Sequence, residues 1–140
     1  MPERSLGDVV KRQNPVTLPD TATVQAACRM MRDQRIGAVL VTAPDGRLTG
    51  LFTGRDAVAR VVAEALDPAK TLLRSVMTLE PEALQPQGHA TDALRMMDDG
   101  GYRHLPVVDG AHVVGMVSRG DFTALDNARL DEETGFWEIM

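Results

Sequence analysis

Cysteine and long apolar segments are nearly missing from this chain of 140 residues, and both shortages exclude whole classes of protein. The single cysteine, Cys28, cannot form an internal disulfide, which fits a reducing compartment. No apolar run approaches the roughly 20 residues that cross a bilayer. The opening letters, "MPERSLGDVV", lack the basic flank and apolar stretch of a signal peptide. We therefore expect a cytoplasmic protein.

Basic charge is also scarce, because 15 lysines and arginines face 20 aspartates and glutamates, for a net charge of −5. Non-specific binding to nucleic acid needs a basic field, so this balance argues against it while leaving room for a small basic pocket. The histidines His89, His104 and His112 are scattered and show no metal-ligand spacing with Cys28. We expect no metal site.

What the chain does contain is ordinary for a globular protein, with 44% hydrophobic and 25% charged residues. Aromatic residues make up only 4%, so the core has to be aliphatic. A chain of this length is near the typical size of one domain and can bury a proper core.

The chain repeats itself at an offset of 65 to 66 residues. The letters "RMM" occur at 29–31 and again at 95–97, and both copies lie on stripes of apolar residues spaced i, i+3, i+4 and i+7. This spacing predicts an amphipathic helix in each copy. The stripes consist of Val24, Ala27, Cys28 and Met31, and of Ala90, Ala93, Leu94 and Met97.

Strand-forming runs at 36–46 and 102–110 follow these helices, and each ends in Asp-Gly, the pair typical of a type I′ hairpin turn. The returning strands are expected at 48–52 and 113–117. A second helix then follows, regular in copy one and less regular around 122–130 in copy two. Its apolar stripe in copy one is Val58, Val61, Val62 and Leu66.

Each repeat therefore reads strand, helix, strand, hairpin, strand, helix, which predicts an α+β fold. "NPVTL" at 14–18 and "EPEAL" at 80–84 supply the first strand of each copy. We place the first motif at 8–66, a linker at 67–75, the second motif at 76–127 and a C-terminal tail at 128–140. A single unit of this size is marginal alone, so we expect the two to pack together about a pseudo-twofold axis.

Two nine-residue stretches, "LTGLFTGRD" at 48–56 and "VVGMVSRGD" at 113–121, carry the same motif of glycine, hydroxyl residue and aspartate. A hydroxyl followed three positions later by an acid is a helix capping box. Capping alone does not require a glycine, but a glycine at the end of a strand lets another group approach the backbone closely. Amides at a helix start suit a phosphate, and an aspartate can accept hydrogen bonds from a ribose diol. Together these features describe a small nucleotide pocket.

Basic residues lie in or beside both motifs: Arg55 and Arg119 within them, and Arg103 with His104 on a neighbouring strand. Guanidinium groups match phosphate geometry. The alternative for each arginine is an exposed, solvated charge.

The order of these features resembles a tandem pair of CBS domains (a Bateman module), the module named after cystathionine β-synthase, here without an attached enzyme. The resemblance covers about residues 8–127 and rests on "NPVTLPDTATVQAA", "SVMT", "YRHLPVVDG" and the two glycine-hydroxyl-aspartate motifs. It implies two α+β units packed sheet to sheet into a disc. It also implies clefts between the units that bind adenosyl ligands, with AMP, ADP or ATP expected first and S-adenosylmethionine or NAD(H) as alternatives.

The resemblance also implies roles for particular residues. Asp56 and Asp121 would hold ribose hydroxyls, while Thr53 and Ser118 would face phosphate. The base would lie against the first strands, beside backbone groups of the strand that follows the first helix. The complete set of ligand residues expected is Val16, Thr17, Gly37, Ala38, Val39, Gly50, Thr53, Arg55, Asp56, Ala83, Leu84, Tyr102, Arg103, His104, Pro106, Gly115, Ser118, Arg119 and Asp121.

The two sites are not identical, because Gly37 and Ala38 stand in copy one where copy two has Arg103 and His104. We expect a phosphate-rich ligand to prefer the second site, where these two residues and Arg119 would gather.

Three classes of function remain open. The first is a regulatory module that binds an adenine nucleotide, needs no cofactor, and signals to a partner. The second is a structural dimerisation adaptor with empty clefts. An enzyme is the third and is not expected, because Cys28 lies on an apolar stripe and no Ser, His and acid constellation is evident. We expect a homodimer, and the tail residues Phe136, Trp137 and Ile139 are candidates for docking on a protein partner.

Overall fold

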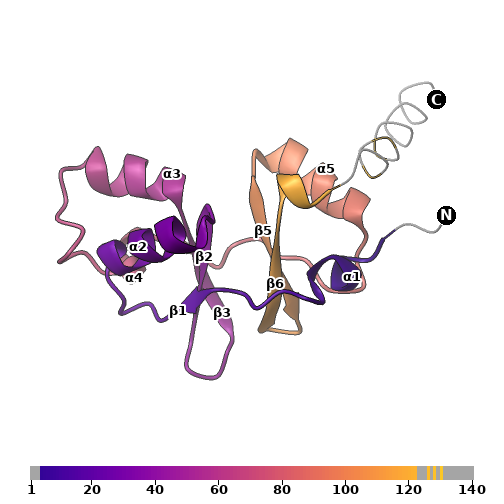
Figure 1. Ribbon diagram of the computed structural model, residues 1–140, viewed down its shortest axis with the longest axis horizontal. Helices are drawn as coiled ribbons and strands as arrows, with labels where there is room; N and C mark the ends of the chain where they lie inside the picture. The colour runs from indigo at the N-terminus through magenta and orange to yellow at the C-terminus, as the bar shows by residue number, and fades with distance from the viewer. Residues whose placement is uncertain (1–3, 123–125, 127, 129, 131–140) are drawn as a thin grey trace. The chain divides into compact units, whose positions relative to one another are not determined.

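The computed structural model (Figure 1) describes residues 4–122 together with residues 126, 128 and 130. The chain divides into two compact units. The first-repeat unit comprises Pro15–Pro81 with Ala111–Val113, and the second-repeat unit comprises Met1–Asn14, Glu82–Gly110 and Val114–Met140. Both units combine helices with strands, so the predicted α+β class is confirmed.

The first-repeat unit is built on a four-stranded sheet in the order β1-β2-β3-β4. Its strands are β1 (Thr17–Leu18), β2 (Ala38–Thr42), β3 (Leu48–Thr53) and β4 (Thr78–Leu79). β1 runs parallel to β2, whereas β2 with β3 and β3 with β4 are antiparallel. The predicted hairpin between β2 and β3 is confirmed.

Helix α2 (Val24–Gln34) packs the predicted apolar stripe into the core of this unit. The hydroxyl of Thr23 accepts the amide of Ala26 and caps the start, and the helix ends where Arg35 adopts a left-handed conformation with φ 55°. Val24, Ala27 and Met31 are buried, whereas Cys28 is only partly buried. Burial raises the pKa of the Cys28 thiol, which keeps it in its neutral form.

The second helix of this unit was predicted to bury its apolar stripe, and this prediction is wrong for most of the stripe. α3 (Gly54–Asp56) continues into the π-helix η1 (Ala57–Val62), in which hydrogen bonds run from each amide to the carbonyl five residues earlier. Of the predicted stripe only Val61 lies in the core, with 1% of its surface exposed, while Val58, Val62 and Leu66, the last of which follows the end of η1, are exposed. Their exposed fractions are 64% for Val58, 73% for Val62 and 43% for Leu66.

The second-repeat unit contains α5 (Ala90–Gly100), β5 (His104–Asp109), β6 (His112–Ser118) and the 3₁₀ turn η2 (Arg119–Asp121). β5 and β6 form a two-stranded sheet. The predicted stripe of α5 is confirmed, because all four of its apolar residues are buried. The irregular helix expected around 122–130 and the tail residues Phe136, Trp137 and Ile139 lie largely or wholly outside the described residues.

The hairpin turns differ from the type I′ geometry that the Asp-Gly pairs predict. Type I′ needs positive φ at both central residues. Only the glycines have it, with 87° at Gly46 and 65° at Gly110, whereas Asp45 and Asp109 do not. In the first hairpin the extra residues Ala43 and Pro44 lengthen the loop, so a single left-handed glycine is sufficient to close it.

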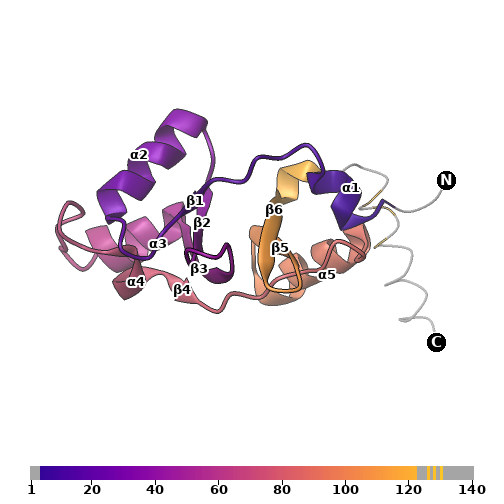
Figure 2. The same cartoon turned by 90° about the horizontal axis from the view of Figure 1, so that it is seen from below.

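The short helix that leads each repeat packs in the unit of the other repeat, an arrangement that the sequence did not predict. α1 (Leu6–Val10) lies with the orange and salmon elements of the second-repeat unit in Figures 1 and 2, where Leu6 and Val10 join its core. α4 (Leu73–Val76) spans the end of the predicted linker and the start of the second motif, but it contributes Leu73 and Val76 to the core of the first-repeat unit. The compact units are therefore assembled differently from the two sequence motifs.

No helix in the described part of the chain is long and apolar enough to span a membrane.

Candidate functional site

The first aspartate turn is closed by reciprocal hydrogen bonds between Thr53 and Asp56. The amide of Thr53 donates to Oδ2 of Asp56 over 3.0 Å, and the amide of Asp56 donates to the Thr53 hydroxyl oxygen over 3.1 Å. The predicted capping box is confirmed. The Asp56 side chain is 14% exposed, and its Oδ1 atom lies 3.6 Å from Nε of Arg60. This carboxylate is thus oriented from the protein side and retains acceptor capacity toward solvent.

Backbone contacts bring the other residues expected in the first site to the same end of the sheet. The amide of Gly54 donates to the carbonyl of Gly37 over 3.0 Å, and Ala38 is the cross-strand partner of Thr53. Val16 accepts a hydrogen bond from the amide of Leu40, which places β1 on the other side of β2. Three strands therefore converge around the turn.

The side chains of this set divide between core and surface. Ala38, Val39 and Gly50 are buried, so of these only backbone groups are open to a ligand. Thr17, Gly37 and Arg55 are exposed.

The second aspartate turn repeats this geometry in the second-repeat unit. The amide of Ser118 donates to Oδ2 of Asp121 over 2.6 Å, and the Ser118 hydroxyl donates to the same oxygen over 3.2 Å. The predicted capping box is confirmed here as well. The amide of Arg119 donates to the carbonyl of Arg103 over 3.3 Å, the counterpart of the contact between Gly54 and Gly37.

The first strand of the second repeat is reduced to a single bridge beside β5. The amide of Leu84 donates to the carbonyl of Pro106 over 2.9 Å, and the amide of Val108 donates to the carbonyl of Leu84 over 2.8 Å. These bonds hold Ala83 and Leu84 against β5, as β1 is held against β2 in the other unit. Pro106 is buried.

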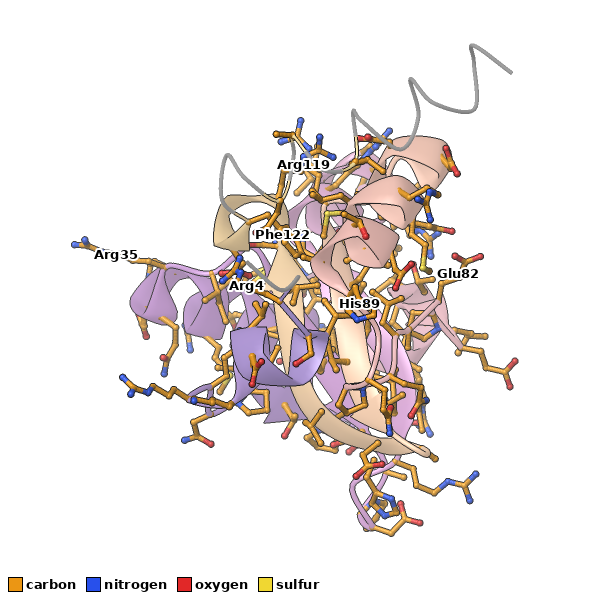
Figure 3. All side chains as sticks on the ribbon, turned by 90° about the vertical axis from the view of Figure 1, so that its right-hand side faces the viewer. Arg4, Arg35, Glu82, His89, Arg119 and Phe122 are labelled. Atoms are coloured by element: carbon orange, nitrogen blue, oxygen red, sulfur yellow. The ribbon has the colours of Figure 1, made fainter. Side chains whose placement is uncertain are left out.

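Three of the four expected basic residues belong to the second-repeat unit, whereas Arg55 belongs to the other. The guanidinium of Arg119 is engaged by Asp98 of α5 at 2.5 Å and lies at the end of that helix in Figure 3. Burial lowers the pKa of His104, Asp121 raises it and Arg103 lowers it again. The balance favours a neutral imidazole at pH 7, so His104 is better suited to hydrogen bonding than to pairing with phosphate.

The close approach that the two motif glycines permit is made by the protein itself. A Cβ atom added to Gly50 would collide with the Met77 side chain, whose Cγ and Cε would lie at 3.0 Å. A Cβ atom on Gly115 would lie 2.5 Å from Cβ of Val10 and 2.9 Å from Oε1 of Gln13. In both units, the segment at the end of the leading helix fills this space.

Tyr102 occupies the turn after α5, where its ring covers Gly100 so closely that any larger residue there would collide with it. The ring is 40% exposed, so one side of it is open to solvent.

Two arginines beside the aspartate turns were not predicted from the sequence. Arg60 contacts Asp56 as described above. Arg4 donates to the carbonyl of Asp121 over 3.0 Å and to Oδ2 of the buried Asp126 over 2.6 Å, and it lies beside the turn that carries Phe122 in Figure 3. Asp56 and Arg60 have the i,i+4 spacing of an ion pair on a helix, so the sequence carried a signal for that contact. The contacts of Arg4 join residues 117 and 122 positions apart, and no local pattern signals them.

Among the described residues, no three His, Cys, Asp or Glu side chains cluster as metal ligands.

The chain belongs to the CBS domain family, whose sequence profile matches residues 6–63 and 73–126. A CBS domain-containing protein of Arabidopsis thaliana, CBSCBSPB3, is 39% identical over 102 residues, which are 73% of this chain and 18% of that protein. The chain thus spans about a fifth of the length of such plant relatives. CBS domain-containing protein YhcV of Bacillus subtilis is 32% identical over 85% of this chain and 82% of its own length.

Solved structures show the same fold. The CBS domain protein PAE2072 of Pyrobaculum aerophilum, solved in complex with AMP, matches with a TM-score of 0.83 and 25% identity. The match covers 91% of this chain and 98% of that one.

Proposed function

We propose that this protein is a regulatory module that binds an adenine nucleotide, AMP, ADP or ATP, at its aspartate turns and transmits the binding to a partner protein. The observation that carries the proposal is the pair of equivalent turns, in which Asp56 and Asp121 are each oriented by an upstream hydroxyl residue. The AMP complex of the structurally similar Pyrobaculum aerophilum protein supports the choice of ligand. No cofactor is required for this role, and catalysis is not part of it.

The chemistry of each turn fits the parts of a nucleotide. A carboxylate with free acceptor capacity binds the two hydroxyls of a ribose. The hydroxyls of Thr53 and Ser118 and the amides that follow them suit a phosphate. The base would lie against the first strand of each repeat, where the backbone of Gly37 or Arg103 faces it.

The second turn has the larger positive charge, so we expect it to favour ligands with more phosphates. Arg103 and Arg119 are both exposed, and Asp98 already neutralises part of the charge of Arg119. The first turn offers Arg55, together with Arg60, which is engaged by Asp56 and by the carbonyls at the end of α4. Any preference between the two sites is therefore modest.

A regulatory role requires that the ligand favour one state of the protein over another, since a ligand that binds both equally shifts nothing. A homodimer would provide a second state through its interface. The exposed side chains of Val58, Val62 and Leu66 are the surface that favours such a dimer. The tail with Phe136, Trp137 and Ile139 is a further candidate contact for a protein partner.

The same exposed surface also favours the second candidate function, an adaptor that dimerises with empty ligand sites. A thermal-shift panel with AMP, ADP, ATP, NAD, NADH and S-adenosylmethionine separates the two functions. Ligand at about 100 times its Kd should stabilise the fold by about 2.7 kcal/mol. A rise in Tm with an adenine nucleotide is the expected result, and unchanged melting across the panel would favour the adaptor.

The aspartates test the proposed binding mode directly. A hydrogen bond to a charged group contributes about 1.5–3 kcal/mol, so Asp56→Ala or Asp121→Ala should weaken binding at its own site about tenfold or more, measured by calorimetry. Each change also removes a capping box. Asp92→Ala is the matched control, because Asp92 accepts the amide of His89 in the capping box of α5 but lies outside both turns. Equal affinities in all four proteins would refute the ribose assignment.

A further inference from the structure

Arg60 connects the first aspartate turn to a segment that is distant in the sequence. Its Nε lies 3.6 Å from Oδ1 of Asp56, and one of its terminal nitrogens donates to the carbonyls of Val76 and Met77 over 3.2 and 3.3 Å. These carbonyls belong to the last turn of α4, where helix carbonyls lack partners within the helix. One guanidinium thus joins the carboxylate of the turn to the end of α4.

The end of α4 also lies just before the point where the chain passes from the first-repeat unit to the second-repeat unit. After Met77 it forms β4 beside β3, passes through Glu80 with φ 46°, and enters the second-repeat unit at Glu82. The side chain of Met77 lies against Gly50, three residues before Thr53. The aspartate turn therefore contacts the outgoing connection through Arg60, and β3, which leads into the turn, contacts it through Met77.

In the second-repeat unit, an arginine from a different part of the sequence makes an equivalent contact with the aspartate turn. Arg4, just before α1, donates to the carbonyl of Asp121 and forms an ion pair with Asp126, whose side chain is only 2% exposed. The segment that follows α1 leaves this unit after Asn14. In both units, one arginine ties the aspartate turn to a leading helix whose chain continues into the other unit.

We propose that Arg60 is a positioning residue that transmits occupancy of the Asp56 site to the α4–β4 connection. The inference rests on the proposed function, because it requires a ligand at Asp56. A bound ribose restrains the Asp56 carboxylate, the restrained carboxylate holds the guanidinium, and the guanidinium holds the final carbonyls of α4. Local opening of residues 73–79 then becomes less frequent when ligand is bound.

Hydrogen exchange of the full chain, with and without saturating AMP, tests this coupling. In the unaltered protein, AMP should slow exchange of the 73–79 segment by about tenfold, the effect of one hydrogen bond to a charged group. Arg60→Met keeps the length of the side chain but removes its charge and donors. In that variant AMP should still bind, but it should no longer slow the exchange of residues 73–79. The fold-change in the Kd for AMP should be smaller than the fold-change in the exchange rate. Arg74→Met is the matched control: it removes an exposed arginine of α4 itself and should retain the slowing.

The outcomes are distinct. If the unaltered protein binds AMP without slowing of 73–79, or if Arg60→Met keeps the full slowing, the coupling through Arg60 is wrong and the proposed function stands. If the unaltered protein binds none of AMP, ADP and ATP, the proposed function fails, and this inference fails with it. Loss of the slowing in Arg74→Met as well would also overturn the assignment, since it would trace the effect to α4 in general.

Discussion

At the scale of single residues, tight packing within the protein explains why positions 50 and 115 are glycine, independently of any ligand. Each sits in a strand at the point where a segment from the end of a leading helix crosses it. The neighbour of Gly50 is the flexible side chain of Met77, whereas the neighbour of Gly115 is Cβ of Val10, an atom fixed to the backbone. The atoms around Gly50 can therefore move to make room for a larger residue more easily than the atoms around Gly115.

This difference predicts unequal costs for two identical substitutions. Overpacking costs about 1–3 kcal/mol, and Gly115→Ala should lie in this range because Val10 cannot move without its helix. Gly50→Ala should cost less, because methionine can change rotamer to make room. Urea unfolding would measure both. Gly120→Ala is the control, since nothing lies within 4 Å of a Cβ atom there. A greater loss of stability in Gly50→Ala would contradict this account.

At the scale of elements, the helix formed by α3 and η1 presents an apolar outer face. In η1, Val61 lies in the core whereas Val58 and Val62 are exposed, and Leu66, which follows the end of η1, is exposed as well. π-helical turns are frequent at functional sites, and large apolar side chains exposed near one another in the sequence are candidates for an interface. These properties support the proposal that this face forms the homodimer contact.

The dimer proposal predicts that one charge on this face will separate the protomers. Val62→Asp should weaken self-association by at least about tenfold, because a twofold interface contains the change twice and buries an unpaired carboxylate. Sedimentation velocity across a range of concentrations would measure this. Leu79→Asp introduces the same charge at a residue of β4 that is 66% exposed, and should leave association unchanged. An unaltered protein that is monomeric at all concentrations would refute the dimer.

At the scale of the whole molecule, the exchange of leading helices makes neither sequence motif a complete folding unit. The core of the first-repeat unit contains Leu73, Val76 and Met77, which lie within the second range matched by the CBS family, 73–126. The core of the second-repeat unit contains Leu6 and Val10, which lie within the first matched range, 6–63. Cutting the chain at the repeat boundary removes buried side chains from both cores.

Two fragments of similar length test the exchange. Residues 15–81 include α4 and should unfold cooperatively on heating, although with low stability for their size. Residues 8–66, the first motif as bounded by the repeat, lack α4 and lose three buried apolar side chains, each of which contributes about 1.5–3 kcal/mol when fully buried. We expect this fragment to show no cooperative transition by circular dichroism. Cooperative unfolding of 8–66 alone would contradict the assembly described here.

The sequence by itself determined the features that depend on local periodicity. The apolar stripes of α2 and α5, the strands around each hairpin and the two capping boxes all follow from patterns that span fewer than about 18 residues. The repeat follows from the recurrence of these local patterns along the chain. Strand pairing next to a hairpin also fixes which backbone groups meet, so Gly37 contacts the first turn at Gly54 and Arg103 contacts the second turn at Arg119.

Only the tertiary structure decided what depends on distant segments or on the exact pitch of a helix. The exchange of α1 and α4, the neighbours of Gly50 and Gly115, and the contacts of Arg4 and Arg60 each join residues far apart in the sequence. The outward stripe of η1 arose because i→i+5 hydrogen bonds rotate side chains away from the positions that a 3.6-residue period predicts. Local sequence patterns do not predict such contacts, because these contacts depend on how the helices and strands pack against one another.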